Sequence, residues 1–138
     1  MENQNNSTFK RAIEKKEKAR LLLDQGKLQE AFSAFEEAGH IFRDIDESSY
    51  AADCYASAAK CWTIRCGEEL YYNAASRYQM AAEEREKYFD FFLASSYYQH
   101  AAEYFQRNNF WRRYSECYYK YKNCIKKEAF YLKHKINI

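Results

Sequence analysis

The chain has 138 residues, a formal net charge of +2, no proline and only three glycines. That length fits one domain with its own hydrophobic core, and the shortage of helix-breaking residues favours an all-helical fold. No run of about 18 apolar residues occurs, so the sequence predicts no transmembrane helix. The first eight residues are polar and lack the apolar stretch of a signal peptide, and an odd count of five cysteines weakens any disulfide framework. We therefore expect reduced thiols and a cytoplasmic protein.

Six helices are predicted in chain order. They are placed at residues 8–24, 28–44, 48–65, 69–86, 89–107 and 110–125. Gly26 and Gly67 follow apolar residues and are expected to end the first and third helices in the left-handed conformation. Ser7, Ser48 and Asn109 are candidate N-terminal caps. The expected division of the chain is a disordered segment over 1–7, a helical-repeat domain over 8–125 and a basic cap or tail over 126–138.

One pattern recurs in five of these helices: a small residue, an aromatic, a small residue and another aromatic, at spacings of four, three and four residues. It occurs at Ala31, Phe35, Ala38 and Phe42; at Ala51, Tyr55, Ala58 and Trp62; at Ala74, Tyr78 and Ala81; at Ala94, Tyr98, Ala101 and Phe105; and, less regularly, at Tyr114, Tyr118, Tyr121 and Ile125. The first aromatic of each unit stands at positions 35, 55, 78, 98 and 118, which are 20 or 23 residues apart.

These spacings place all four residues of a unit on one helix face, so each unit is one helix. The small residues permit close approach of a neighbouring helix, and the aromatic residues fill the space between. Gly39, inside a repeat, is interpreted as a further small residue at such a contact. We predict a right-handed α-solenoid of antiparallel helical hairpins, tetratricopeptide-like, with about six helices and with Tyr118 and Tyr121 in its core.

The cysteines and histidines do not form a metal-binding pattern. Cys54 and Cys61 are seven residues apart, as are Cys117 and Cys124, which separates each pair by about 10 Å along a helix. That distance is too long for two ligands of one zinc ion, so these cysteines are interpreted as core residues. Cys66, just beyond the helix that holds Cys61, lacks a matching second pair.

Glu37 and His40 have the Glu-x-x-His spacing of carboxylate-bridged di-iron bundles, which need that element twice. Tyrosines stand three residues before His100 and His134, so the second element is missing. We therefore expect no metal and no other cofactor.

No catalytic motif stands out. The sequence has no glycine-rich phosphate loop and no nucleophile elbow. Ser95, Ser96 and the Glu83, Glu84 and Glu86 cluster are explained as helix surface. The sequence therefore predicts a protein that is not an enzyme.

The strings Ala31–Phe42 and Tyr50–Trp62 resemble consecutive helices of the soluble NSF attachment protein family. Residues 74–82 and 94–105 continue the likeness, which covers roughly residues 12–125, the repeat portion only. An ordinary tetratricopeptide repeat fits less well because its period is 34 residues. The resemblance implies a tetratricopeptide-like solenoid that acts as an adaptor in vesicle-mediated and intracellular protein transport. Such an adaptor binds a SNARE helical bundle and recruits the NSF ATPase.

Charge is unevenly divided along the chain. From residue 107 onward nine basic residues stand against Glu116 and Glu128, a net charge of +7, which leaves −5 on residues 1–106. The basic end also carries aromatic residues, a mixture suited to protein interfaces. The candidate partner-binding residues are Trp111, Arg112, Arg113, Tyr119, Lys120, Lys126 and Lys127.

The basic end suits an acidic partner, which is expected to be a protein. The alternatives are peripheral contact with an anionic membrane, a generic tetratricopeptide-like interaction module and, less favoured, nucleic acid. Residues 126–138 are expected to fold back as a helical cap on the last repeat helix. If they leave that face open instead, self-association is expected.

Overall fold

The computed structural model describes the backbone of residues 2–66 and 71–136 and the side chains of residues 6–64 and 72–134. Over this part the chain forms six α-helices and no strand, which confirms the predicted all-helical class. The helices are α1 (Glu2–Asp24), α2 (Leu28–Asp44), α3 (Ser48–Cys66), α4 (Tyr71–Lys87), α5 (Phe91–Arg107) and α6 (Trp111–Ile136). Four of the predicted helices agree with these bounds to within two residues at each end.

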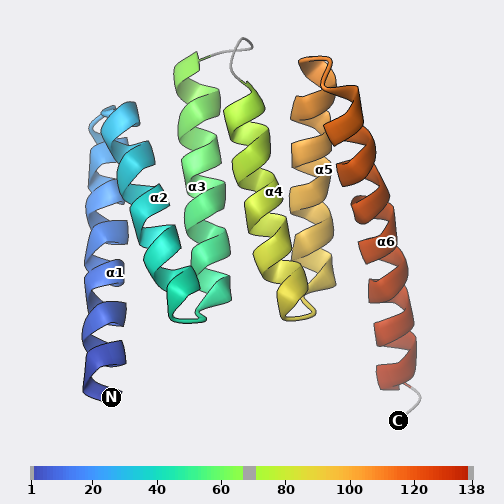
Figure 1. Cartoon of the computed structure of the whole chain (residues 1–138), viewed down its shortest axis with the longest axis horizontal. Coiled ribbons are helices and arrows are strands. Elements are labelled where there is room, and N and C mark those ends of the chain that lie inside the picture. Colours follow the sequence, from blue (N-terminus) through green and yellow to red (C-terminus); the bar gives the residue numbers. More distant parts are fainter. Residues whose placement is uncertain (1, 67–70, 137–138) are drawn as a thin grey trace.

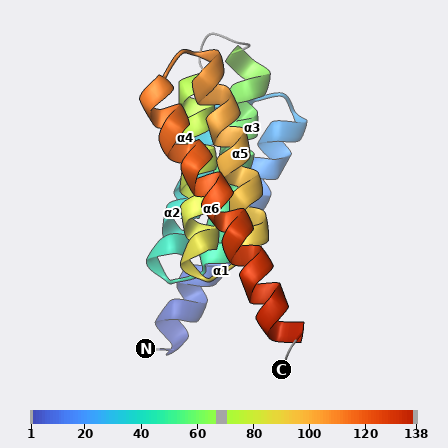
Figure 2. The same ribbon diagram turned by 90° about the vertical axis from the view of Figure 1, so that its right-hand side faces the viewer.

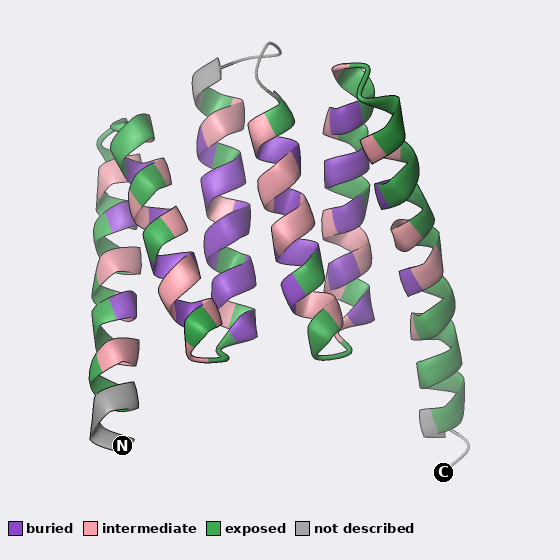
Figure 3. Ribbon diagram, viewed as in Figure 1, coloured by how far each residue is buried: buried purple, intermediate pink, exposed green. Residues whose placement is uncertain are grey.

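The first and last helices are longer than predicted. Helix α1 begins at Glu2 and so includes residues 2–7, for which the sequence pattern predicted disorder; Ser7 lies inside the helix and is not its cap. Helix α6 continues to Ile136, so the expected fold-back of the tail is wrong. From residue 125 to residue 134 every residue except Glu128 is exposed. Figure 3 shows these last turns extending below the ends of α2 to α5.

The helices form a row of antiparallel neighbours (Figure 1). Each helix packs extensively against the one before it and the one after it in the sequence. Viewed from the end of the row, α2 and α4 lie on one side and α3 and α5 on the other (Figure 2). Contacts between alternate helices tie each side together: Arg77 of α4 reaches Glu36 of α2 at 2.6 Å, and Phe9 of α1 lies edge-on to Tyr50 of α3.

Small residues and buried rings make the core. The alanines at the repeat positions are fully buried, as are Phe42, Tyr55, Tyr98 and Phe105. Gly39 lies where α2 meets α3, and a Cβ built on it would stand 2.9 Å from the ring of Tyr55. Gly39 is therefore the close helix contact that the pattern indicates. Trp62 is half-buried and packs edge-on against Phe32.

Tyr118 departs from the predicted core, because its side chain is 40% exposed. The residues on α6 that dock onto the preceding helices are Cys117 and Cys124, which are buried, while Tyr121 is half-buried. The repeat pattern predicted the helix correctly, but it did not predict which face of the last helix would be covered.

Four of the turns between helices have the same backbone conformation. The second residue after the last residue of the helix has a positive φ, at Gly26 (77°), Asp46 (61°), Phe89 (64°) and Asn109 (63°). In each turn this residue and the next donate backbone hydrogen bonds back into the preceding helix, in the arrangement of a Schellman motif. The left-handed conformation at Gly26 was predicted, whereas Asn109 ends α5 instead of capping α6. Gly67 lies outside the described residues.

Phe89 is the least suitable residue for this turn position, and its replacement by glycine should stabilise the protein. A left-handed conformation costs about 1–2 kcal/mol for an ordinary L-residue, whereas glycine adds about 0.5–1 kcal/mol of unfolded-chain entropy. The Phe89 ring is 71% exposed, so little packing is lost. We expect Phe89→Gly to raise the free energy of unfolding by about 0.5–1 kcal/mol in urea titrations.

The matched control for this prediction is Gly26→Ala, at the same turn position after α1. It should lower the free energy of unfolding by about 1 kcal/mol, since alanine must then adopt the positive φ. A loss of stability in Phe89→Gly would show instead that the edge-on contact between Phe89 and Phe91 outweighs the backbone strain.

Candidate functional site

The predicted partner-binding residues separate into two groups. Trp111, Arg112, Tyr119 and Lys126 are exposed on α6. Tyr119 is 70% exposed, and Arg112 forms an ion pair with Glu116 of its own helix at 3.6 Å. These four side chains are accessible to a partner.

The other three predicted residues are engaged within the chain. The guanidinium of Arg113 lies 4.8 Å from the ring centre of Phe105 and donates to Gln79 Oε1 at 2.7 Å and to the Tyr72 hydroxyl at 3.2 Å. Lys120 lies over the ring of Tyr98, and Lys127 lies over the ring of Phe91. Cation–π contacts of this kind attach α6 to α4 and α5. These residues hold the last helix in place.

A groove runs between α5 and α6 on their accessible side. Its first part has a volume of about 430 Å³, and its second part adds about 220 Å³. Gln99 and Tyr121 line both parts, so the two are continuous. The α6 wall consists of Tyr114, Tyr118, Tyr121, Ile125 and Glu128, and the α5 wall consists of Phe92, Ser95, Ser96, Gln99, Ala102, Glu103 and Gln106.

Lysines lie beside the aromatic wall of this groove. Lys122 follows Tyr118 by one helical turn, and its Nζ is 4.7 Å from the centre of that ring. Lys126 and Lys133 continue along the same side of α6 at spacings of four and seven residues. Within the described part of the chain these three lysines form no ion pair. The wall therefore combines exposed apolar area with uncompensated positive charge.

The groove residues Phe92, Tyr114 and Ile125 were not predicted as candidates for binding. One signal was available in the last repeat: Tyr114 and Tyr121 replace the alanines that occupy the small positions in the other helices. Bulky residues at those positions indicate that α6 does not present its repeat face to a closely approaching helix.

The described cysteines have the properties of core residues. Cys54, Cys61, Cys117 and Cys124 are all reduced and buried. Burial raises the pKa of the Cys54 thiol to about 12 and that of each of the other three to about 11. Thiols with such pKa values hold their protons at neutral pH and are poor nucleophiles.

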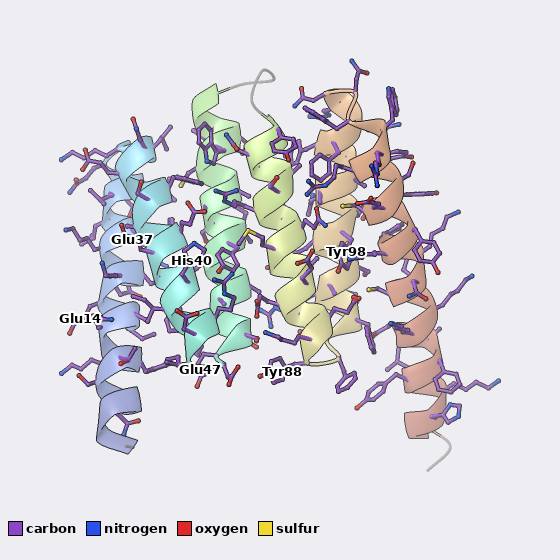
Figure 4. All side chains as sticks on the ribbon, in the orientation of Figure 1. Glu14, Glu37, His40, Glu47, Tyr88 and Tyr98 are labelled. Atoms are coloured by element: carbon purple, nitrogen blue, oxygen red, sulfur yellow. The ribbon has the colours of Figure 1, made fainter. Side chains whose placement is uncertain are left out.

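Glu37 and His40 do not converge. His40 Nδ1 is hydrogen-bonded to the Tyr55 hydroxyl at 2.8 Å, whereas Glu37 forms an ion pair with Lys15 of α1 at 2.9 Å. Figure 4 shows the two side chains on different parts of α2. Among the described residues no group of three or more His, Cys, Asp or Glu side chains is placed to hold a metal ion.

The glutamate cluster on α4 is partly buried rather than fully solvated. Glu84 is buried and accepts a hydrogen bond from Ser48 Oγ at 2.9 Å, so Ser48 ties α3 to α4. Beside it, Arg85 binds Asp53 at 2.8 Å and Asp90 at 3.3 Å. These polar contacts join the start of α3, the end of α4 and the start of α5, which is a structural role.

Known proteins give no further guide to function. The chain matches no protein-family model, no curated protein and no solved structure. Among the described residues no helix combines the length and the apolar character needed to cross a bilayer.

Proposed function

We propose that this protein is a non-catalytic adaptor that binds protein partners through a right-handed, tetratricopeptide-like α-solenoid. One observation carries the proposal: the repeat residues are used in the core, while α6 exposes aromatic residues next to lysines that form no ion pair within the described residues. Exposed aromatic residues mixed with basic residues are typical of protein interfaces. Packing between sequence neighbours supports the solenoid.

The resemblance to the attachment proteins makes the proposal more specific. On this proposal the partner is a SNARE-type helical bundle, an NSF-type ATPase is a second partner, and the protein works in the cytoplasm, where it contacts membranes peripherally. The likeness of the repeats supports this version.

Binding to an assembled SNARE bundle tests this version directly. The assembled bundle should bind to the immobilised protein, whereas its separate helices should not. The double variant Arg112→Glu, Tyr119→Ala changes two exposed side chains and should weaken binding by at least ten-fold. Lys10→Glu with Lys60→Ala, at exposed positions on α1 and α3, is the matched control. Equal binding of bundle and separate helices would refute the SNARE version.

The charge of the last helix favours a second candidate, binding to an anionic membrane surface. Residues 107–138 carry a net charge of +7, which would attract acidic lipid headgroups. Binding to vesicles with 30% phosphatidylserine, measured by co-sedimentation, would then fall steeply as salt is raised from 50 to 300 mM. Binding that does not change with salt concentration would exclude an electrostatic membrane-binding function.

A further inference from the structure

The exposure of Tyr118 has a specific structural cause. Phe35 on α2 is buried in one cluster with Ala58 and Cys61 of α3, the helix that follows it. Tyr78 on α4 holds the same repeat position and is covered by three rings of α5. Those rings belong to Tyr97, His100 and Tyr104, and they leave Tyr78 only 6% exposed.

Tyr118 stands forty residues after Tyr78, at the same repeat position on α6. Its nearest rings, Tyr114 and Tyr121, are on its own helix. Helix α5 covers one side of the Tyr78 ring. The corresponding side of the Tyr118 ring is open, because no described helix follows α6. The geometry of the repeat therefore leaves a place for one more helix against α5 and α6.

Three substitutions between the repeats suit this place to an occupant that binds and dissociates. Ala52 and Ala56 of α3 are buried, and Ser95 and Gln99 replace them on α5 forty-three residues later. Polar side chains at these positions lower the cost of leaving the α5 wall in water. Lys122 likewise replaces Ala82, which is fully buried on α4.

The charges indicate the chemistry of the occupant. Lys122, Lys126 and Lys133 lie along one side of the groove without an ion pair in the described chain. The carboxylates at the groove do not neutralise these lysines. Glu103 is bound by Arg107 at 2.8 Å, and the one negative charge of Glu128 cannot balance three positive charges. An occupant with acidic residues on the facing side would supply the missing partners.

A second copy of the chain does not fit this requirement. Two α6 helices facing each other would bring two strongly basic surfaces together. Head-to-tail stacking would place α1 in the groove, but α1 carries six basic and four acidic residues, a net charge of +2. Like charges at an interface oppose association. The groove therefore favours a different molecule.

We propose that the groove between α5 and α6 binds an acidic amphipathic helix of another protein, in the place that α5 occupies on α4. The apolar face of that helix packs on Tyr118, Tyr121 and Ile125, and its carboxylates pair with the lysines beside them. This is helix-in-groove recognition. The inference rests on the proposed function in that it names the class of partner that the adaptor binds.

Two synthetic peptides test the proposal. The first is a labelled 18-residue helix with leucine and alanine along one face and glutamate elsewhere, and the second has lysine in place of each glutamate. Fluorescence anisotropy with the intact protein should show the acidic peptide binding at least ten-fold more tightly. A central proline in the acidic peptide should abolish binding, since proline breaks the helix.

Substitutions then locate the site. The triple change Lys122→Glu, Lys126→Glu, Lys133→Glu should lower the affinity for the acidic peptide at least ten-fold. Tyr118→Ala should lower it by a similar factor. The matched control is a triple change of exposed lysines elsewhere to glutamate, at Lys10, Lys27 and Lys60, and should change the affinity less than two-fold. Methyl resonances of Ala102 and Ile125 should shift on titration with the peptide, while those of Ala31 should not.

The outcomes distinguish this inference from the broader function. Failure of the acidic peptide to bind, or equal weakening by the control triple, would overturn the groove assignment. The adaptor proposal would still stand if the chain bound the SNARE bundle. A dimer in sedimentation equilibrium that Tyr118→Ala dissociates would assign the groove to a second copy. Binding to phosphatidylserine vesicles but to neither peptide would assign it to a membrane.

Discussion

Replacing Tyr98 by alanine should lower the free energy of unfolding by about 4 kcal/mol, whereas Tyr118→Ala should lower it by about 1 kcal/mol. The two tyrosines hold the same position in consecutive repeats. Tyr98 is 1% exposed, its hydroxyl donates to Glu86 Oε2 at 3.3 Å, and Lys120 lies over its ring. Its loss would leave a cavity between α4, α5 and α6. Tyr118 is 40% exposed and would leave no enclosed space.

Urea titrations followed by circular dichroism provide the measurement, since domains of this size usually unfold in one step. Tyr98→Phe is the control: it keeps the ring and removes the hydrogen bond to Glu86, for a loss of about 1 kcal/mol. Equal losses for the two alanine variants would show that α6 buries Tyr118 in solution. The ring of Tyr118 would then not be open to a partner helix, and the groove between α5 and α6 would not be its binding site.

The sequence predicted the inner helices well because both of their ends carry local signals. The spacing of alanine and aromatic residues marks each helix, and polar turns with a residue in the left-handed conformation separate them. At residue 125, where the last helix was predicted to end, the sequence has no such signal. The residues that follow, Lys126, Lys127, Glu128 and Ala129, are good helix formers. The predicted end at residue 125 was based on the length of the repeat unit. The helix continues beyond it because these residues favour the helical conformation.

The site could be predicted only in part. Charge and aromatic content located it on the last helix, and five of the seven candidate residues are exposed there. Arg113, Lys120 and Lys127 have the same composition signal, but they lie over rings of α4 and α5. Which basic side chain meets a ring depends on how the helices are aligned in three dimensions, and no spacing within one helix contains that information. The exposure of Tyr118 likewise depends on a neighbour that the repeat cannot specify.

Alkaline pH should unfold the protein cooperatively between about pH 10 and 11, because four buried thiols must lose their protons. Burial raises the pKa of Cys54 from 9.0 to about 12, and that of Cys61, Cys117 and Cys124 from 9.0 to about 11. Desolvation also raises the pKa of Tyr55 from 10.0 to about 12. These groups are neutral in the folded protein at pH values where the unfolded chain has already ionised.

The sign follows from proton binding. Between pH 9 and 11 the unfolded state binds fewer protons than the folded state, so stability falls as the pH rises. Each thiol contributes a slope of about 1.4 kcal/mol per pH unit, and four thiols together about 5 kcal/mol per unit. A domain of this size has only about 5–15 kcal/mol of stability to lose. Below about pH 8 the same thiols give almost no pH dependence, because both states keep the protons.

Urea midpoints measured from pH 8 to 10.5, with a phosphine reductant present to prevent disulfide formation, give this slope directly. A variant with alanine at the four buried cysteines Cys54, Cys61, Cys117 and Cys124 should start less stable at pH 8 but should lose stability much more slowly above pH 9. Its remaining slope would come from buried tyrosines such as Tyr55 and Tyr78, which ionise about one unit later. An unchanged slope in this variant would show that the thiols are hydrated in solution and that α3 and α6 do not pack through their cysteines.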